Sequence, residues 1–345
     1  NDQYRGWFNS SLTLSVAVLE ESPYKAVVTH GFVVDDKGEK MSKSKGNTLD
    51  PTKLANEYGA DILRLWTATI DYQEDARLSV ELLRQTSETY RKIRNTFRFM
   101  LGNLPALTAT REEIRALYQE PSFYIDKLMV AKLQHVVNKM IDSYNDYDFG
   151  SAFTVLMNFV TNELSSFYLD IAKDILYCEA KESPRRHSVV RTLYQVTMAL
   201  LPLIAPVLVF TAEEIYDHLP VIKREKSVHL MDFPYMLPDD KDKLEQFSAL
   251  LKVRSNAYQH IEVARQHGLI GSSQEARLTL PKSELAVAPM LQELDATELA
   301  RFFIVSDVKF GNAYNVVKHM GHKCPRCWNY HDSLVKVGDV DVCGR

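Results

Sequence analysis

Two lysines three positions apart, Lys40 and Lys43, lie in a short stretch that could bind phosphate groups. Ser42 and Ser44 stand beside them, and Gly46 follows. A flexible cationic loop of this kind can close on a polyphosphate, where negative charge develops during phosphoryl or adenylyl transfer. The serine hydroxyls and backbone N–H groups near Gly46 can add hydrogen bonds. The stretch predicts a polyphosphate site, although two lysines at this spacing alone more often form a solvated turn.

Three of the four cysteines are spaced like metal ligands. Cys324 and Cys327 form a C-x-x-C pair, and Cys343 follows after fifteen residues. Zinc ribbons pair two such knuckles at this separation, because four thiolates can then close a tetrahedron. We expect one zinc ion whose fourth ligand is a cysteine beyond the end of the sequence, with His322 or His331 as substitutes. The alternative is a redox or incidental pair.

Arginines gather in two groups. Those of the first group are spaced seven, three and four apart, which puts them on one helical face, and the stretch they span holds five cations and one acid. Such a stripe is usually a solvated face, but a local excess of positive charge is also typical of nucleic-acid binding. The first group is Arg84, Arg91, Arg94 and Arg98, and the second is Arg185, Arg186 and Arg191.

Composition limits the classes of protein that could carry these residues. The chain has 345 residues, 46% of them apolar and 25% charged, with 13 Gly and 13 Pro. These values exclude disordered and collagen-like chains and predict two or three domains. Four cysteines are too few for a disulfide scaffold and indicate a reducing, cytosolic setting. The net charge of −4, taken alone, argues against a nucleic-acid partner.

The lysine loop needs elements that hold it. A helix over Trp7–Leu19 opens the chain, and the β-branched run 26–34 predicts a short buried strand. The polar loop 35–47 follows, and then a helix that begins at Asp50-Pro51 and ends at Gly59. Strand, basic loop and helix in this order predict the end of an α/β domain.

Helical periodicity dominates the rest of the chain. Ser79 caps a helix with Gly102 beyond its end, and three further helical stretches complete a bundle over 80–220. A lone cysteine, Cys178, is interpreted as packing. The later elements are an amphipathic helix over 241–267, short strands at 276–280 and 302–305, and a helix near 285–300 between those strands.

No membrane span or signal peptide is predicted. Residues 192–212 carry no formal charge, but their purely apolar run Met198–Phe210 has 13 residues and contains two prolines. A span needs about 20 apolar residues, so a buried, proline-broken helix is the better interpretation. The chain opens Asn1-Asp2-Gln3, without the basic and apolar regions of a signal peptide. Both ends are expected to be cuts through a longer protein.

The complete string Lys40-Met41-Ser42-Lys43-Ser44 resembles the KMSKS signature of class I aminoacyl-tRNA synthetases. The flanking stretches are similar to isoleucyl-tRNA synthetases of the bacterial type, and the resemblance covers essentially the whole chain. Valyl, leucyl and methionyl enzymes share the lysine loop but fit these flanks less well. The stretches are 2–8 (DQYRGWF), 29–32 (THGF), 59–66 (GADILRLW) and 90–96 (YRKIRNT).

The resemblance implies an enzyme that activates isoleucine with ATP and Mg and transfers it to tRNA-Ile. Lys43 matches the ATP-contacting lysine, Lys40 assists, and Ser42 and Ser44 belong to the same ATP site. Asp2 and Gln3 match the vicinity of the aminoacyl-adenylate.

Two parts of the family are expected to lie outside this chain, so the isolated piece should not catalyse aminoacylation. They are the editing domain and the second nucleotide motif, H-x-G-H. The run His319-Met320-Gly321-His322 fits the letters of that motif. It follows the expected strands and adjoins the cysteine pair, so we interpret it as a coincidence.

The fold class implied is multidomain, with a remnant of a Rossmann-type α/β catalytic domain followed by an all-α anticodon-binding bundle, a small α+β region and a truncated zinc ribbon. The expected bounds are 1–50 for the catalytic remnant with its KMSKS loop, 51–80 for junction helices, 81–240 for the bundle, 241–320 for the α+β region and 321–345 for the ribbon. The arginines of the first group become phosphate contacts. Trp328 and Tyr330 cover the metal or stack on an anticodon base, and we expect cover.

Two other assignments remain open from the sequence. Within the class, the chain could come from a valyl- or leucyl-tRNA synthetase. From another class, it could be a non-catalytic tRNA-binding zinc-ribbon protein that kept a lysine loop by descent. The leading interpretation predicts a cytoplasmic monomer with no membrane partner.

Overall fold

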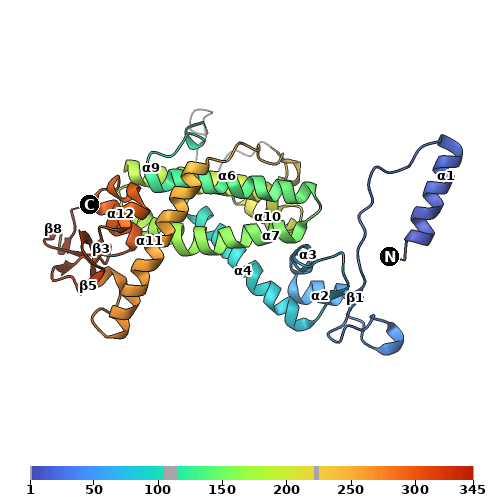
Figure 1. Ribbon diagram of the computed structural model, residues 1–345, viewed down its shortest axis with the longest axis horizontal. Coiled ribbons are helices and arrows are strands. Elements are labelled where there is room, and N and C mark those ends of the chain that lie inside the picture. Colours follow the sequence, from blue (N-terminus) through green and yellow to red (C-terminus); the bar gives the residue numbers. More distant parts are fainter. Residues whose placement is uncertain (1, 105–114, 221–224, 345) are drawn as a thin grey trace.

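The computed structural model describes residues 2–104, 115–220 and 225–344, with the side chain of Lys43 left out. Figure 1 shows helices gathered in the middle of the molecule, with strands β3, β5 and β8 at the C-terminal end and helix α1 at the opposite end. No helix in the described ranges is long and apolar enough to cross a membrane.

The N-terminal segment contains less regular structure than the sequence predicts. A π-helical turn, Tyr4–Phe8, runs into α1 (Asn9–Leu19), and neither has a buried residue. The expected strand over 26–34 is wrong in extent: β1 covers only Val33–Val34, and Val27 and Val28 are 40% and 45% exposed. A strand needs a neighbour to receive its hydrogen bonds. The two-residue strand β2 (Ala76–Arg77) pairs with β1 in parallel, and Val34 makes one isolated bridge to Lys40.

The N-terminal segment passes close to the backbone of residues 72–75, and this close approach requires a glycine at position 31. The Gly31 N–H donates to the Tyr72 carbonyl at 2.9 Å. A Cβ on Gly31 would lie 2.2 Å from the Glu74 carbonyl oxygen, so no larger residue fits the approach.

The two helices after the lysine loop agree with prediction. Asp50 caps α2 (Pro51–Tyr58) by accepting from the Thr52 N–H at 2.9 Å. Gly59, at φ +100°, separates α2 from α3 (Ala60–Thr69). A backbone at this φ favours glycine, which is why the chain can turn between the two helices there.

A helix bundle forms the centre of the molecule, as predicted. Ser79 caps α4 by accepting from the Leu82 N–H at 3.2 Å, while Gly102 lies inside α4 rather than beyond it. A π-helical stretch, Phe159–Tyr168, joins α7 to α8. The helices are α4 (Val80–Asn103), α6 (Tyr124–Asn145), α7 (Phe149–Asn158), α8 (Leu169–Cys178), α9 (Pro184–Ile204) and α10 (Val209–Asp217).

The uncharged stretch over 192–212 lies in the bundle core. Leu200, Leu201 and Leu203 of α9 are fully buried, and Pro202 lies within the same helix. Burial among neighbouring helices accounts for the apolar character of this run, as the sequence predicts.

A small α+β region follows the bundle. Helix α11 (Lys241–Gln266) leads into a sheet of order β4-β3-β5, in which β3 pairs in parallel with β4 and antiparallel with β5. A short 3-10 turn, Pro289–Gln292, separates two of its helices. The remaining elements are β3 (Ala276–Pro281), α12 (Glu284–Val287), α13 (Ala296–Phe303), β4 (Asp307–Gly311) and β5 (Asn315–Lys318).

Two expectations for this region are wrong. The single helix near 285–300 is broken into α12, the 3-10 turn and α13. The strand at 302–305 does not form, because Phe302 and Phe303 end α13 and Ile304 adopts φ +51°. Phe302 packs edge-on against Phe167 of the bundle at 5.6 Å between ring centroids. A short apolar run cannot be distinguished from a buried helix end by its pattern alone.

The last residues form two small antiparallel hairpins. One pairs β6 (His322–Lys323) with β7 (Tyr330–His331), and the other pairs β8 (Val335–Val337) with β9 (Val340–Val342). The bundle, α11 and the three-stranded sheet share one continuous core, which extends from Leu65 to Val316.

Candidate functional site

The lysine loop lies between β1 and α2, as the sequence predicts. Residues Lys43–Lys45 form a single 3-10 turn, and the Ser42 and Ser44 hydroxyls lie 3.2 Å apart. The Lys40 ammonium lies 4.2 Å from the centre of the Phe32 ring and 4.0 Å from the Asp2 carboxylate. The structure therefore places Lys40, predicted for the ATP site, close to Asp2, predicted for the vicinity of the adenylate. The Lys43 side chain lies outside the described atoms.

Two residues that the sequence did not mark hold this loop. Asp35 accepts from the N–H groups of Lys37 (3.0 Å) and Glu39 (2.8 Å), and Asn47 donates to the second oxygen of the same carboxylate at 2.8 Å. These hydrogen bonds, led by the one from Asn47, lower the pKa of Asp35. In the sequence, Asp35 and Asn47 border a glycine-containing loop, which is the one pattern that could have marked them. They are too far apart in sequence for a turn motif to predict their contact.

The cysteine cluster is assembled as predicted. Cys324, Cys327 and Cys343 are buried, and their sulfur atoms all lie within 4.8 Å of one another. The Cys327 and Cys343 sulfurs are 3.7 Å apart. Thiolates around one tetrahedral zinc, at Zn–S of about 2.3 Å, would be about 3.8 Å apart. The three side chains therefore fit a zinc ion, with a fourth ligand still to be supplied.

Hydrogen bonds to sulfur favour thiolates at this site. The Cys343 N–H donates to the Cys324 sulfur at 3.3 Å. Burial raises the pKa of Cys324, but N–H donors from Cys343, Cys327 and Arg326 outweigh it and lower the pKa to about 7. The His331 Nε2 lies 3.5 Å from the Cys327 sulfur, yet His331 is not within the group of three. His322 is exposed in β6.

Cys178 packs against the knuckle, consistent with its predicted packing role. It lies at the end of α8, is buried, and its sulfur approaches the Arg326 carbonyl oxygen at 3.5 Å. Among the described residues, Cys178 and the three ribbon cysteines form one small buried cluster with Leu334 and Val342 packed against it. The cluster joins the ribbon to the bundle.

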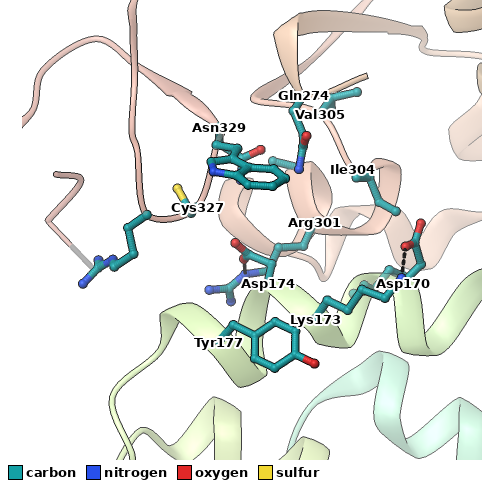
Figure 2. Close-up of a pocket in the computed structure, with 14 residues that line it drawn as sticks. Asp170, Lys173, Asp174, Tyr177, Gln274, Arg301, Ile304, Val305, Cys327 and Asn329 are labelled. Carbon is teal, nitrogen blue, oxygen red and sulfur yellow. Dashed lines mark hydrogen bonds and ion pairs between the residues drawn. The ribbon is translucent and has the colours of Figure 1, made fainter. Parts of the chain in front are cut away.

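The expectation that Trp328 covers the metal is wrong. Its side chain is 61% exposed, and its backbone adopts φ +64°. Trp328 helps to line a pocket of about 360 Å³ between the knuckle and the bundle. Figure 2 shows Lys173 and Tyr177 of α8 on one side of this pocket and Cys327 and Asn329 of the knuckle on the other. The tight cysteine turn is closed by the Trp328 N–H bond to the Cys324 carbonyl at 2.8 Å, which leaves the indole outside.

The first arginine group lies on α4, and acids accompany three of its members. Arg84 pairs with Glu81 and Arg91 with Glu88 within the helix, at 3.5 and 2.8 Å. Arg94 pairs with Glu214 of α10 at 2.9 Å. Arg98 has no acidic partner among the described residues, and it lines a shallow groove with Arg94 and His218. The three pairs are substantially exposed, so they weaken the local positive charge only partly.

Arg185, in the second arginine group, is not available to a nucleic acid, whereas Arg186 and Arg191 are half-buried. Arg185 is 5% exposed and forms ion pairs with Asp126 (2.6 Å) and Glu298 (3.0 Å). Arg186 donates to the Leu176 carbonyl and Arg191 to that of Glu120. A charged side chain this deeply buried is held by fixed partners and cannot also reach a phosphate.

The H-x-G-H letters at 319–322 follow β5 and run into β6. His319 is buried, and its Nδ1 accepts from the Gly321 N–H at 3.0 Å. A Cβ on Gly321 would lie 2.3 Å from the His331 carbonyl oxygen, so this glycine serves the β6–β7 hairpin. The motif does not precede a helix, which supports the interpretation as a coincidence.

Comparison with known proteins agrees with this arrangement. The family model "tRNA synthetases class I (I, L, M and V)" matches residues 1–79, and "Anticodon-binding domain of tRNA ligase" matches residues 126–280. The LeuRS of Agrobacterium radiobacter K84, solved as a ternary complex with tRNA and LeuAMS, superposes with a TM-score of 0.50. It is 17% identical and covers 69% of this chain and 27% of its own, which shows a shared fold. The chain belongs to the class I aminoacyl-tRNA synthetases.

Curated relatives narrow the family within that class. "Isoleucine--tRNA ligase 1" of Oceanobacillus iheyensis is 43% identical over 341 residues, or 95% of this chain and 36% of that protein. The isoleucine–tRNA ligases of Staphylococcus epidermidis and Staphylococcus aureus are 40% and 41% identical over the whole chain and 38% of their own lengths. The chain belongs to the isoleucine–tRNA ligase family, and it spans little more than a third of the length of these relatives.

Proposed function

We propose that this chain is part of an enzyme that activates isoleucine with ATP and Mg and transfers it to tRNA-Ile. The observation that carries the proposal is the 40% identity with isoleucine–tRNA ligases over the whole chain, in which the lysine loop has the expected place after β1 and before α2. The chain contributes the ATP loop, the anticodon-binding bundle and the ribbon. The complete enzyme is expected to be a cytoplasmic monomer.

Within the ATP loop, Lys43 and Lys40 neutralise charge during adenylate formation. The isoleucine carboxylate attacks the α-phosphorus of ATP, a bond to that phosphorus forms, and the bond to pyrophosphate breaks. Negative charge grows on the departing pyrophosphate, where cationic side chains stabilise it most. Ser42 and Ser44 donate hydrogen bonds to the same phosphates. Asp2, which lies 4.0 Å from Lys40, and Gln3 belong to the adenylate side.

The lysine loop supplies the test of this function. Lys43→Ala in the complete enzyme should slow isoleucine-dependent ATP–pyrophosphate exchange by about 100-fold or more, because one strong transition-state contact is lost. The affinity for isoleucine should change little. Lys45→Ala is the matched control, since Lys45 is paired with Glu39 at 3.1 Å, and it should exchange at close to the normal rate. Unchanged exchange in Lys43→Ala would contradict the assignment.

The ribbon over 321–345 is proposed to hold one zinc ion through Cys324, Cys327 and Cys343. Their burial, sulfur spacing and lowered Cys324 pKa support the site. Zinc when bound supplies a structural cross-link that such a small element cannot obtain from a core of its own. The chain's residues fix the two knuckles through the Cys343 N–H bond to sulfur.

The bundle and the ribbon are proposed to contact tRNA. The family model for anticodon binding matches residues 126–280, which include most of the bundle, α11 and β3. The divisions at 50, 80, 240 and 320 stay a prediction. Arg84, Arg91, Arg94 and Arg98 are phosphate contacts on α4. The exposed Trp328 supports base stacking rather than metal cover.

A further inference from the structure

The segment before the lysines folds back on itself as a tight hairpin. The Asp35 N–H donates to the Glu39 carbonyl at 3.0 Å, and the Gly38 N–H donates to the Asp35 carbonyl at 3.0 Å. Gly38 adopts φ +79° at the tip, and Val34 bridges to Lys40. The backbone position of Lys40 is therefore set by this turn.

One side chain ties the far end of the loop to the turn. The Asn47 amide nitrogen donates to the Asp35 carboxylate at 2.8 Å, and its oxygen accepts from the Ser42 N–H at 2.9 Å. The same nitrogen lies 3.4 Å from the Lys40 carbonyl oxygen. Asn47 thus contacts the turn, the first lysine and the start of the 3-10 turn that carries Lys43.

We propose that Asp35 and Asn47 are positioning residues that hold the lysine loop in register for ATP. This inference rests on the proposed function of the loop. We call the pair the Asp35–Asn47 clasp. It fixes residues 40 and 42 by hydrogen bonds, and Ser44 and Lys45 of the 3-10 turn that follows are exposed.

Two physical arguments support a role in catalysis beyond local stability. A loop that is ordered before ATP binds loses less conformational freedom in the transition state, and misplacement by about 1 Å can cost about 100-fold in rate. The clasp is also specific in its atoms: every polar atom of Asp35 and Asn47 side chains has a partner within the loop. The charged neighbours are Lys37, Glu39 and Lys45 on the loop, together with Arg77, whose guanidinium lies next to Gly38.

The donor and acceptor pattern allows a reciprocal test. In Asn47→Asp two carboxylates face each other, and in Asp35→Asn two amides do, so each single variant breaks the clasp. In the double variant Asp35→Asn/Asn47→Asp the new amide at 35 can accept from residues 37 and 39 and donate to the new carboxylate at 47. That carboxylate can still accept from the Ser42 N–H, and of the clasp's hydrogen bonds only the long one to the Lys40 carbonyl (3.4 Å) is lost. Asp36→Asn is the matched control, because it removes a neighbouring exposed acid outside the clasp.

Isoleucine-dependent ATP–pyrophosphate exchange in the complete enzyme measures the effect. Each single variant should lower kcat/KM for ATP by about 10- to 100-fold, while the KM for isoleucine and the melting temperature change little. The double variant should recover to within about threefold of the parent, and Asp36→Asn should match the parent.

The outcomes separate this inference from the proposed function. Singles with normal kcat/KM for ATP, or a double variant no better than the singles, would overturn the clasp as a positioning device. A loss that tracks a falling melting temperature and active-site titre would show a purely structural role and would also overturn it. A parent enzyme without isoleucine-dependent exchange would instead refute the proposed function.

Discussion

Trp328 shows how a single side chain separates two roles of the ribbon. It follows a cysteine of the buried cluster directly, yet its indole is exposed and lines the pocket between the knuckle and α8. An exposed aromatic ring in a pocket that Lys173 also lines is a surface on which an unstacked base can lie. Metal binding and base binding should therefore respond to different substitutions.

The prediction is that Trp328→Ala weakens tRNA-Ile binding while zinc content stays unchanged. Loss of one base–aromatic stack should cost about 1–3 kcal/mol. Cys327→Ser is the contrasting variant, and it should lose both zinc and tRNA affinity because a ligand is removed. Filter binding together with metal analysis, on protein that contains the fourth ligand, checks both. Loss of zinc from Trp328→Ala would contradict this prediction and would show that the indole covers the metal.

At the residue scale, local patterns predicted the caps and the cysteine cluster but not long-range partners. Asp50 and Ser79 were recognisable because a cap acts within three residues. Arg185 looked like a surface cation, and only the fold brings Asp126 and Glu298 to it. The Asp35–Asn47 clasp was not predicted for the same reason, because its two residues become neighbours only in the folded loop.

At the element scale, α3 is fastened to the start of α10 by side chains. The Asp61 carboxylate accepts from the Thr211 N–H (2.8 Å) and hydroxyl (2.6 Å), so it caps a helix distant in sequence. Arg64 donates to the carbonyls of Pro206 and Val207 at 2.7 and 3.0 Å. These contacts link the helices next to the lysine loop with the anticodon-binding bundle.

Removing this cap should destabilise the protein measurably. Asp61→Ala leaves buried donors at the start of α10 without a partner, so the free energy of unfolding should fall by about 1–3 kcal/mol. Glu81→Ala is the control, since Glu81 lies in the first turn of α4 in an exposed pair with Arg84, which contributes about 0–1 kcal/mol. Urea denaturation followed by circular dichroism compares them. If both variants lower the free energy of unfolding equally, the Asp61 cap stabilises the protein no more than an exposed ion pair does.

Elements were predicted best where their own sequence determines them. The helices of the bundle have long apolar stripes and recognisable ends, so their positions follow from periodicity. The strand over 26–34 and the strand at 302–305 failed because pairing partners decide whether extended or short apolar segments become strands. In the first case β2 supplies only two residues, and in the second the segment ends α13.

At the scale of the whole molecule, the distribution of charge explains how a chain of net charge −4 can suit tRNA. Cations concentrate on the lysine loop and on α4, while Arg185 and Arg301 are paired inside the protein with Asp126, Glu298, Asp174 and Glu179. Exposed charges act over about 10 Å at moderate salt. If tRNA binds α4 as proposed, the local field of this helix, rather than the total charge, acts on the phosphate backbone.

The salt dependence of tRNA binding measures that local field. Replacing both Arg91 and Arg98 with Gln should weaken binding of this chain to tRNA-Ile. Each phosphate contact releases counterions, so the slope of log K against log salt should fall by about 0.7–0.9 per arginine lost. Arg94 is left intact because its pair with Glu214 ties α4 to α10, and replacing it would mix folding with binding.

A matched control decides whether the effect is local. Arg265→Gln removes an exposed cation on α11 that is paired with Glu262 at 3.0 Å, much as Arg91 is paired with Glu88 at 2.8 Å. If Arg265→Gln leaves the slope of log K against log salt unchanged, Arg265 does not contact tRNA phosphates. If the Arg91/Arg98 variant and Arg265→Gln lower the slope by the same amount per charge, binding follows total charge and α4 is not the contact surface. If only the α4 variant lowers it, the arginine stripe carries the phosphate contacts.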